Sequence, residues 1–188
     1  GNSFIQSLGI SILNCLEMLR ITNNIILGII VIAFIHGCDK ELTIYENDVE
    51  IYLLEEYELV KNKCKINDST IILRNKELIN NNDIEYYILS DHKFVLTNNG
   101  IEKHKNMSDG VPFCLTVDRE IIYSGFFKPG YSSSSCWHSV TIDPLSYRDN
   151  EIHVRLGYPG TLDDEPIEPD PRENEFLIGT FKNQGKLR

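Results

Sequence analysis

The chain has 188 residues, which is enough for one domain or for one domain preceded by a targeting segment. Its 41% hydrophobic and 10% aromatic residues are typical of a folded protein with a sizeable core. The formal net charge of −10 argues against nucleic acid and against an anionic membrane surface as partners, because both are bound by clustered Lys and Arg.

The first 37 residues are nearly uncharged, with Glu17 and Arg20 as their only acidic and basic side chains. Within them, residues 25–35 form a run of eleven residues without a polar side chain. A membrane-spanning helix needs roughly 20 apolar residues, whereas the apolar region of a secretory signal peptide has about 7–15. We therefore expect a signal peptide that starts at Met18, with residues 1–17 upstream of it.

The segment Ile35-His36-Gly37-Cys38 follows the apolar run. An aliphatic residue, a variable residue, a small residue and a cysteine in this order resemble the lipobox of bacterial lipoproteins. The resemblance implies that the Cys38 thiol is alkylated with diacylglycerol and that the chain is cut after Gly37, where a small side chain is needed. Residues 1–37 would then comprise the upstream residues and the signal peptide, which is cleaved off, and residues 38–48 would be the lipidated cysteine and its tether. Two alternatives are an uncleaved transmembrane anchor and a buried core helix.

The hydrophobic pattern after the tether predicts a single domain over residues 49–188. Segments rich in β-branched and aromatic residues predict strands over residues 49–54, 70–73, 84–89, 93–96, 111–117, 120–127, 137–142 and 151–156. Helices are predicted over residues 97–105, with Thr97 or Asn98 as N-cap, and over residues 173–186. The fold class that follows is α+β, with a small, mainly antiparallel sheet and one or two helices.

The clearest hairpin is predicted where residues 111–117 and 120–127 are joined by Asp118 and Arg119. Gly is preferred at the second position of a type I′ turn, and Arg119 stands there instead. We therefore expect a different type of turn at this hairpin.

Two patterns in the domain resemble known families. Phe94–Lys103 (FVLTNNGIEK) followed by Gly110–Asp118 (GVPFCLTVD) resembles the periplasmic head of the translocase accessory subunit SecD. The wider pattern, from VEIYLL through PFCLTVD and IIYSGFF to SSSSC and DPRENEFL, is similar to small uncharacterised lipoproteins of gut Bacteroidales. The resemblance implies a fold of ferredoxin-like character and an address in the bacterial envelope, and it implies no reaction.

Three cysteines remain in the domain once Cys38 is lipidated, namely Cys64, Cys114 and Cys136. A disulfide is expected in an oxidising envelope, and the odd number leaves at least one thiol free. Pairings of Cys64 with Cys136 and of Cys114 with Cys136 are both open, because spacing alone does not determine connectivity. Cys136-Trp137-His138 could supply a Cys–His nucleophile, but nothing marks a third member. We interpret the segment as a strand that enters the core with Trp137 buried.

Two loops are candidate binding segments. Residues 128–135 form a Gly/Ser loop, in which the ligand contacts would come from Tyr131, Ser132, Ser133, Ser134 and Ser135. Residues 157–171 form an acidic loop. Its carboxylates, from Asp163 to Asp170, are interrupted by two prolines and lack the EF-hand spacing, so we expect the loop to be solvated rather than to bind calcium. No pair of cysteines or histidines has the usual spacing of metal ligands, so we predict no metal site and no cofactor.

The sequence therefore predicts a lipoprotein of the bacterial envelope, anchored to a membrane by lipid, with a non-enzymatic domain that binds a protein or a glycan. One alternative is a hydrolase of the cell wall or of glycans with carboxylates as acid and base. Another is a translocation-accessory module. The residues after Cys38 do not choose between the inner and the outer membrane.

Overall fold

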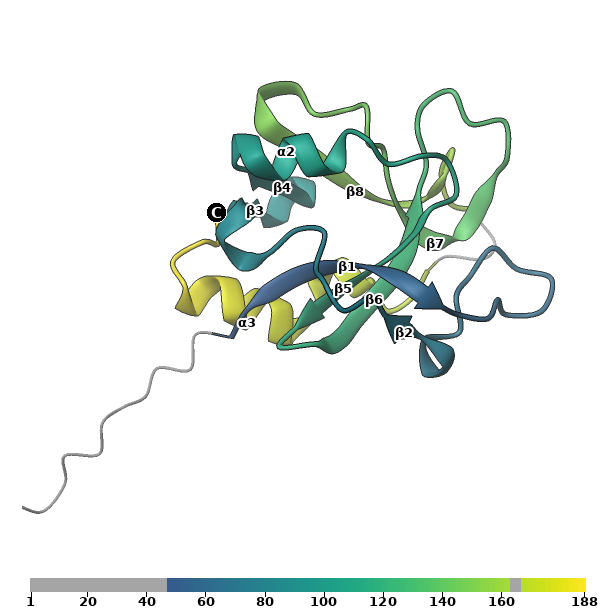
Figure 1. The fold of residues 1–188 in the computed structure, drawn as a ribbon, viewed down its shortest axis with the longest axis horizontal. Coiled ribbons are helices and arrows are strands. Elements are labelled where there is room, and N and C mark those ends of the chain that lie inside the picture. The colour runs from purple at the N-terminus through teal and green to yellow at the C-terminus, as the bar shows by residue number, and fades with distance from the viewer. Residues whose placement is uncertain (1–46, 163–166) are drawn as a thin grey trace, which may run out of the picture. The chain divides into compact units, whose positions relative to one another are not determined.

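An eight-stranded sheet forms most of the computed structural model, which describes residues 47–162 and 167–188 (Figure 1). The segment with the expected signal peptide and Cys38 lies outside the described residues. The strands are β1 (Val49–Glu56), β2 (Ile72–Leu73), β3 (Ile84–Ile88), β4 (Lys93–Leu96), β5 (Pro112–Val117), β6 (Glu120–Phe127), β7 (Cys136–Ile142) and β8 (Glu151–Tyr158). The helices are α2 (Asn98–His104) and α3 (Glu175–Asn183), and the 3-10 turns are η1 (Asp68–Thr70), η2 (Asn81–Asp83), η3 (Leu89–Asp91), η4 (Arg148–Asn150) and η5 (Pro171–Glu173).

The strands are ordered β2-β1-β5-β6-β7-β8-β4-β3 across the sheet. Among the described residues, every neighbouring pair is antiparallel except β6 and β7, which are parallel. The α+β class is confirmed, but the sheet is larger than the small sheet we expected. A ferredoxin-like domain alternates as β-α-β-β-α-β, whereas here β1 to β4 all precede α2, so that expectation is wrong.

Helix and strand ends follow local chemistry that the sequence already shows. The Thr97 hydroxyl accepts from the Gly100 amide at 3.2 Å, which makes Thr97 the N-cap of α2 as predicted. The strand expected over residues 70–73 is shorter, because η1 takes Thr70 and only Ile72 and Leu73 pair with β1.

The β5–β6 turn corrects our expectation. Asp118 and Arg119 have φ values of 50° and 65°, and positive φ at both central residues is the signature of a type I′ turn. Contacts to β1 and to the residue before it stabilise this turn in place of a glycine. The Asp118 carboxylate accepts from the Asp48 amide at 2.7 Å, and the Arg119 guanidinium lies 5.0 Å from the centre of the Tyr52 ring.

The main core lies between the sheet and α3. Leu177 and Phe181 of α3 are fully buried against this face. The Phe181 ring is 5.4 Å from Tyr87 and 6.0 Å from Phe94, and those two rings are 4.9 Å apart. Aromatic contacts of this kind add to the free energy of apolar burial, and they fix α3 against β3 and β4.

A smaller core lies on the opposite face of the sheet. Its buried members are Leu54, Ile66, Cys114, Phe126 and Cys136. Because side chains alternate along a strand, Cys114 and Phe126 turn away from the main core while their neighbours turn into it. This second face is covered by the loop over residues 57–67, which supplies Ile66.

The parallel pair β6–β7 requires a close approach of backbones. A Cβ atom at Gly125 would overlap the carbonyl oxygen of Val140 and the ring of Phe113. A glycine is therefore needed where β6 passes β7.

Neither helix of the described residues is long and apolar enough to cross a membrane.

One buried histidine makes stability depend on pH. His104 of α2 is 1% exposed, its ring lies 5.6 Å from that of Phe127, and its Nε2 atom has no hydrogen-bond partner among the described residues. Burial lowers the pKa of His104 to about 4, and the smaller effect of the neighbouring Asp143 acts in the opposite direction.

We predict that the protein loses stability as the pH falls from about 6.5 to about 4, because the unfolded chain protonates His104 before the folded chain does. The loss attributable to His104 is about 3 kcal/mol. Urea unfolding across this pH range should show a smaller loss for His104→Gln. The half-buried His153→Gln is the matched control and should keep most of the loss. An identical pH dependence for wild type and His104→Gln would contradict the prediction.

Candidate functional site

A disulfide joins the 57–67 loop to the start of β7. Of the two pairings that the sequence leaves open, the structure has Cys64–Cys136, with Cα atoms 5.2 Å apart. Cys114 is buried and free, and burial raises the pKa of its thiol to about 12. The bond connects residues 72 positions apart, so it fixes a loop that local structure alone would hold weakly.

The disulfide also decides the chemistry of Cys136-Trp137-His138. The Cys136 sulfur is not a thiolate, so it cannot act as a nucleophile while the bond is intact. The expectation that Trp137 is buried is wrong, because Cys136 faces the core and the next side chain turns outward, 39% exposed.

The 57–67 loop folds back on itself as a narrow hairpin. A bridge pairs Leu59 with Ile66, and the Val60 amide donates to the Lys65 carbonyl at 2.8 Å. Asn62 at its tip has a φ of 61°, a conformation that Asn tolerates better than most residues. The Cys64 carbonyl accepts from the Ser139 hydroxyl at 2.7 Å, which holds the returning arm against β7.

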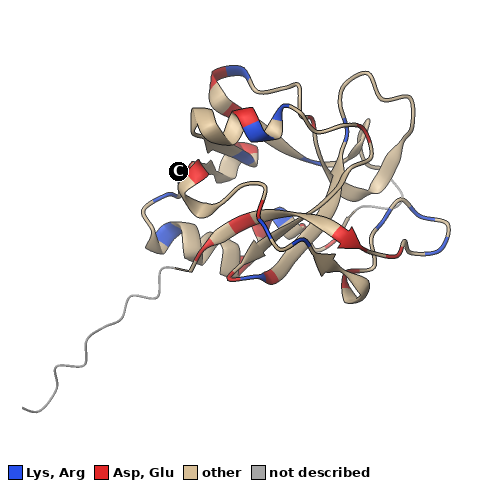
Figure 2. Cartoon of the chain, in the orientation of Figure 1, with Lys and Arg blue, Asp and Glu red and all other residues tan. Residues whose placement is uncertain are grey.

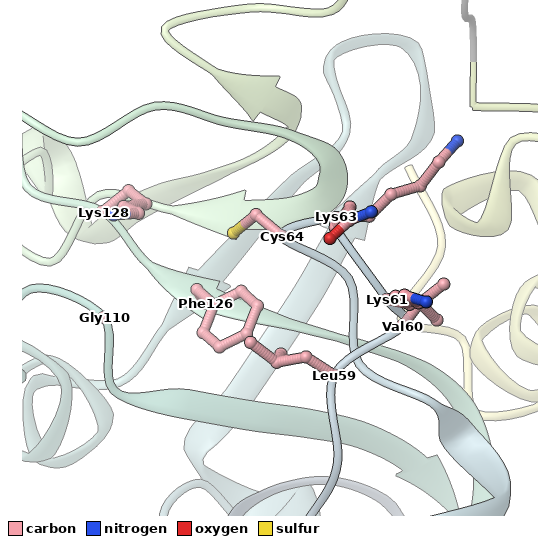
Figure 3. A pocket seen from close by; sticks show the side chains of 9 residues that line it. Leu59, Val60, Lys61, Lys63, Cys64, Gly110, Phe126 and Lys128 are labelled. Carbon is pink, nitrogen blue, oxygen red and sulfur yellow. The ribbon is translucent and has the colours of Figure 1, made fainter.

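An open pocket of about 470 Å³ lies between this loop and the sheet (Figure 3). It is lined by Leu59, Val60, Lys61, Asn62, Lys63, Cys64, Gly110, Phe126 and Lys128. Phe126 is 5% exposed and forms part of the apolar lining, while Leu59 and Val60 are 53% and 37% exposed. Exposed apolar side chains beside a hollow are typical of a binding surface.

The charge of the pocket is opposite to that of the chain. Three lysines, Lys61, Lys63 and Lys128, line it, and none of its nine lining residues is acidic. Figure 2 shows basic residues gathered on the loop between β1 and β2, in a chain with a net charge of −10. Lys61 has no carboxylate partner among the residues that the structure describes, so its ammonium is available to an acidic ligand.

Lys128 has a different role, because its side chain is 6% exposed and its ammonium is hydrogen-bonded within the protein. It donates to the Asp109 carboxylate at 3.1 Å and to the Ser134 hydroxyl at 2.7 Å. Burial alone would raise the pKa of Asp109, but the hydrogen bonds from Lys128 and Ser132 lower it. The ion pair therefore holds the turn before β5 against the Gly/Ser loop.

The predicted ligand loop is split by these contacts. Ser132 and Ser134 face Lys128, and the Ser132 hydroxyl also donates to Asp109 at 2.9 Å. Tyr131 is 70% exposed, and Ser133 and Ser135 are exposed beside it. The loop thus contributes two structural serines and three outward side chains.

Ser134 and Lys128 are in close contact, but they do not form a pair of nucleophile and general base. A lysine base must be a neutral amine, whereas Lys128 forms an ion pair with Asp109. The Ser134 oxygen accepts a hydrogen bond from the ammonium and keeps its own proton.

Among the described residues, no two buried carboxyl groups face each other. Asp83 is the only buried carboxyl group among the described residues. It is bonded to Lys103 and to Asn99, each at 2.6 Å, and caps η2 through Asn80. Part of the acidic loop, residues 163–166, lies outside the described residues.

The sequence analysis missed the lysine-rimmed pocket. Its signal was present in two places, as the alternating Lys61, Lys63 and Lys65 in an acidic chain and as a single Lys128 directly after the apolar end of a strand. Neither signal indicates that the two segments lie side by side. The Cys64–Cys136 disulfide brings them together, and the sequence alone does not determine that pairing.

Comparison of the chain with protein-family models, with curated proteins and with solved structures gives no match.

Proposed function

We propose that this chain is a lipoprotein of the bacterial envelope, anchored through Cys38, whose domain is a non-enzymatic binding module. The lipobox pattern before Cys38 supports the address. The Cys64–Cys136 disulfide supports it independently, because structural disulfides persist in oxidising compartments such as the bacterial periplasm and the cell surface.

The binding site that we propose is the pocket beside the 57–67 loop, and its partner is an acidic protein segment that carries an apolar side chain. The observation that carries this proposal is an apolar pocket with a lysine rim in a strongly acidic chain. An apolar side chain would be buried against Leu59 and Phe126, and a flanking carboxylate would meet Lys61. Charge complementarity of this kind sets specificity and the rate of association.

A glycan partner fits this pocket less well. A glycan presents hydroxyl groups along its length, and these lose hydrogen bonds to water when they enter an apolar pocket. Leu59, Val60 and Phe126 offer no donors in return. The protein partner is therefore the better match to the lining.

The address is tested by metabolic labelling of cells with an alkyne fatty acid. We predict that the wild-type chain takes up the label and that Cys38→Ala does not, because the thiol is the site of alkylation. Cys114→Ala is the matched control and should remain labelled. A wild-type chain without label would overturn the proposed anchor.

The pocket is tested with short fluorescent peptides that have a central Phe or Leu flanked by Asp and Glu. We predict that Lys61→Glu with Lys63→Glu weakens binding about tenfold or more, because the positive charge beside the pocket becomes negative and repels an acidic ligand. Raising the salt concentration should weaken wild-type binding in the same direction.

The matched control is Lys76→Glu with Lys182→Glu, which changes the net charge equally at exposed positions outside the pocket. It should retain the wild-type affinity within about threefold. Equal losses in both double variants would show a general charge effect and would contradict a site at the pocket. Tighter binding of acidic oligosaccharides than of the peptides would favour the glycan partner instead.

A further inference from the structure

A second cluster of polar side chains lies where the β3–β4 connection meets the segment before α3. His92 follows η3 in the left-handed conformation with a φ of 49°, Asp170 caps η5 and Glu173 ends it. One ligand atom from each of these three side chains lies within 4.8 Å of the other two. His92 Nε2 and Glu173 Oε1 are 3.8 Å apart.

The hydrogen bonds of Tyr87 fix which nitrogen of His92 carries the proton. The Tyr87 hydroxyl has a single proton to donate. That proton is donated to the Arg172 carbonyl at 3.1 Å, because a carbonyl can only accept. In the hydrogen bond of 3.3 Å between the Tyr87 oxygen and His92 Nδ1, the donor is then the N–H of the histidine. Nε2 is left with its lone pair.

The Nε2 atom of His92 lies 3.8 Å from the Glu173 carboxylate, and Asp170 belongs to the same cluster. The ligand atoms of His92, Asp170 and Glu173 all lie within 4.8 Å of one another. An imidazole nitrogen and two carboxylates therefore converge on one point. Three converging electron-pair donors attract a cation.

Arg172 holds Asp170 in place without removing it from the cluster. Its Nε donates to Asp170 Oδ1 at 3.0 Å and its Nη2 donates to Oδ2 at 2.6 Å, while Nη1 donates to the Val154 carbonyl at 3.1 Å. The guanidinium offsets one of the two carboxylate charges. Hard cations such as Ca²⁺ need several anionic oxygens, whereas borderline divalent ions accept imidazole nitrogen with fewer charges.

We propose that His92, Asp170 and Glu173 form a binding site for one borderline divalent metal ion such as Zn²⁺. Tyr87 is a positioning residue, because it accepts the second ring N–H of a metal-binding histidine and so orients the ligand nitrogen. The Glu173 side chain is 62% exposed, and Asp170 and Glu173 both border a groove of about 730 Å³. The ion would therefore keep coordination positions open to water or to an external ligand. This site uses none of the residues of the proposed peptide pocket.

The test is calorimetric titration of the full chain, purified in detergent, with Zn²⁺ alone. We expect one equivalent to bind, with Ca²⁺ binding more weakly. His92→Asn keeps a residue that tolerates positive φ, and Glu173→Gln removes only a charge. Each should weaken Zn²⁺ binding at least about tenfold, as should Tyr87→Phe. His153→Asn and Glu175→Gln are the matched controls and should bind as the wild type does.

Thermal unfolding with and without Zn²⁺ gives a second measurement, in which the melting temperature should rise for the wild type and both controls only. Glu173 is exposed, so Glu173→Gln is expected to fold. This variant still tests the site if Tyr87→Phe fails to fold. No binding by the wild type would overturn the site. Equal affinity in the wild type and in His92→Asn and Glu173→Gln would overturn it as well.

Discussion

The Cys64–Cys136 disulfide is the constraint on which the pocket depends. The 57–67 loop leaves the sheet after β1 and makes its own narrow hairpin, but only Ile66 is buried within it. Without the covalent bond, ordering such a loop costs conformational entropy that few apolar contacts offset. The bond places the lysine-bearing arm of the loop over Phe126, so an apolar floor and a basic rim meet in advance of any ligand. A preformed pocket loses less free energy to ordering when it binds.

The Gly/Ser loop over residues 128–135 is also held in place by long-range contacts. It connects β6 to β7, which are parallel neighbours, within eight residues, although such connections usually need a dozen or more. The Lys128–Asp109 ion pair and the Tyr158 hydroxyl, which lies within hydrogen-bonding distance of the Gly130 and Ser132 carbonyls, hold this short crossover in place. Some of the serines that the sequence marks as a ligand loop therefore stabilise the fold, while the others are exposed on the surface.

The sequence was sufficient for features that local patterns determine. Alternating apolar residues located the strands, and the Thr97 cap located α2. Long-range contacts decided the rest. The connection between β6 and β7 is too short to have suggested a parallel pair. The turn at Arg119 is stabilised by Tyr52, which lies on a strand far away in the sequence. The cluster of His92, Asp170 and Glu173 joins residues about 80 positions apart, so no spacing could indicate it.

The most direct test of this account is peptide affinity with and without the disulfide. We would titrate one acidic, apolar peptide into the oxidised protein, into Cys64→Ser with Cys136→Ser, and into Cys114→Ala as the control. The titration would be done at a temperature where circular dichroism shows every variant folded. The account predicts equal affinity for the oxidised protein and the control, and affinity weaker by about tenfold for the double variant. Unchanged affinity in the folded double variant would contradict the claim that the disulfide forms the binding pocket.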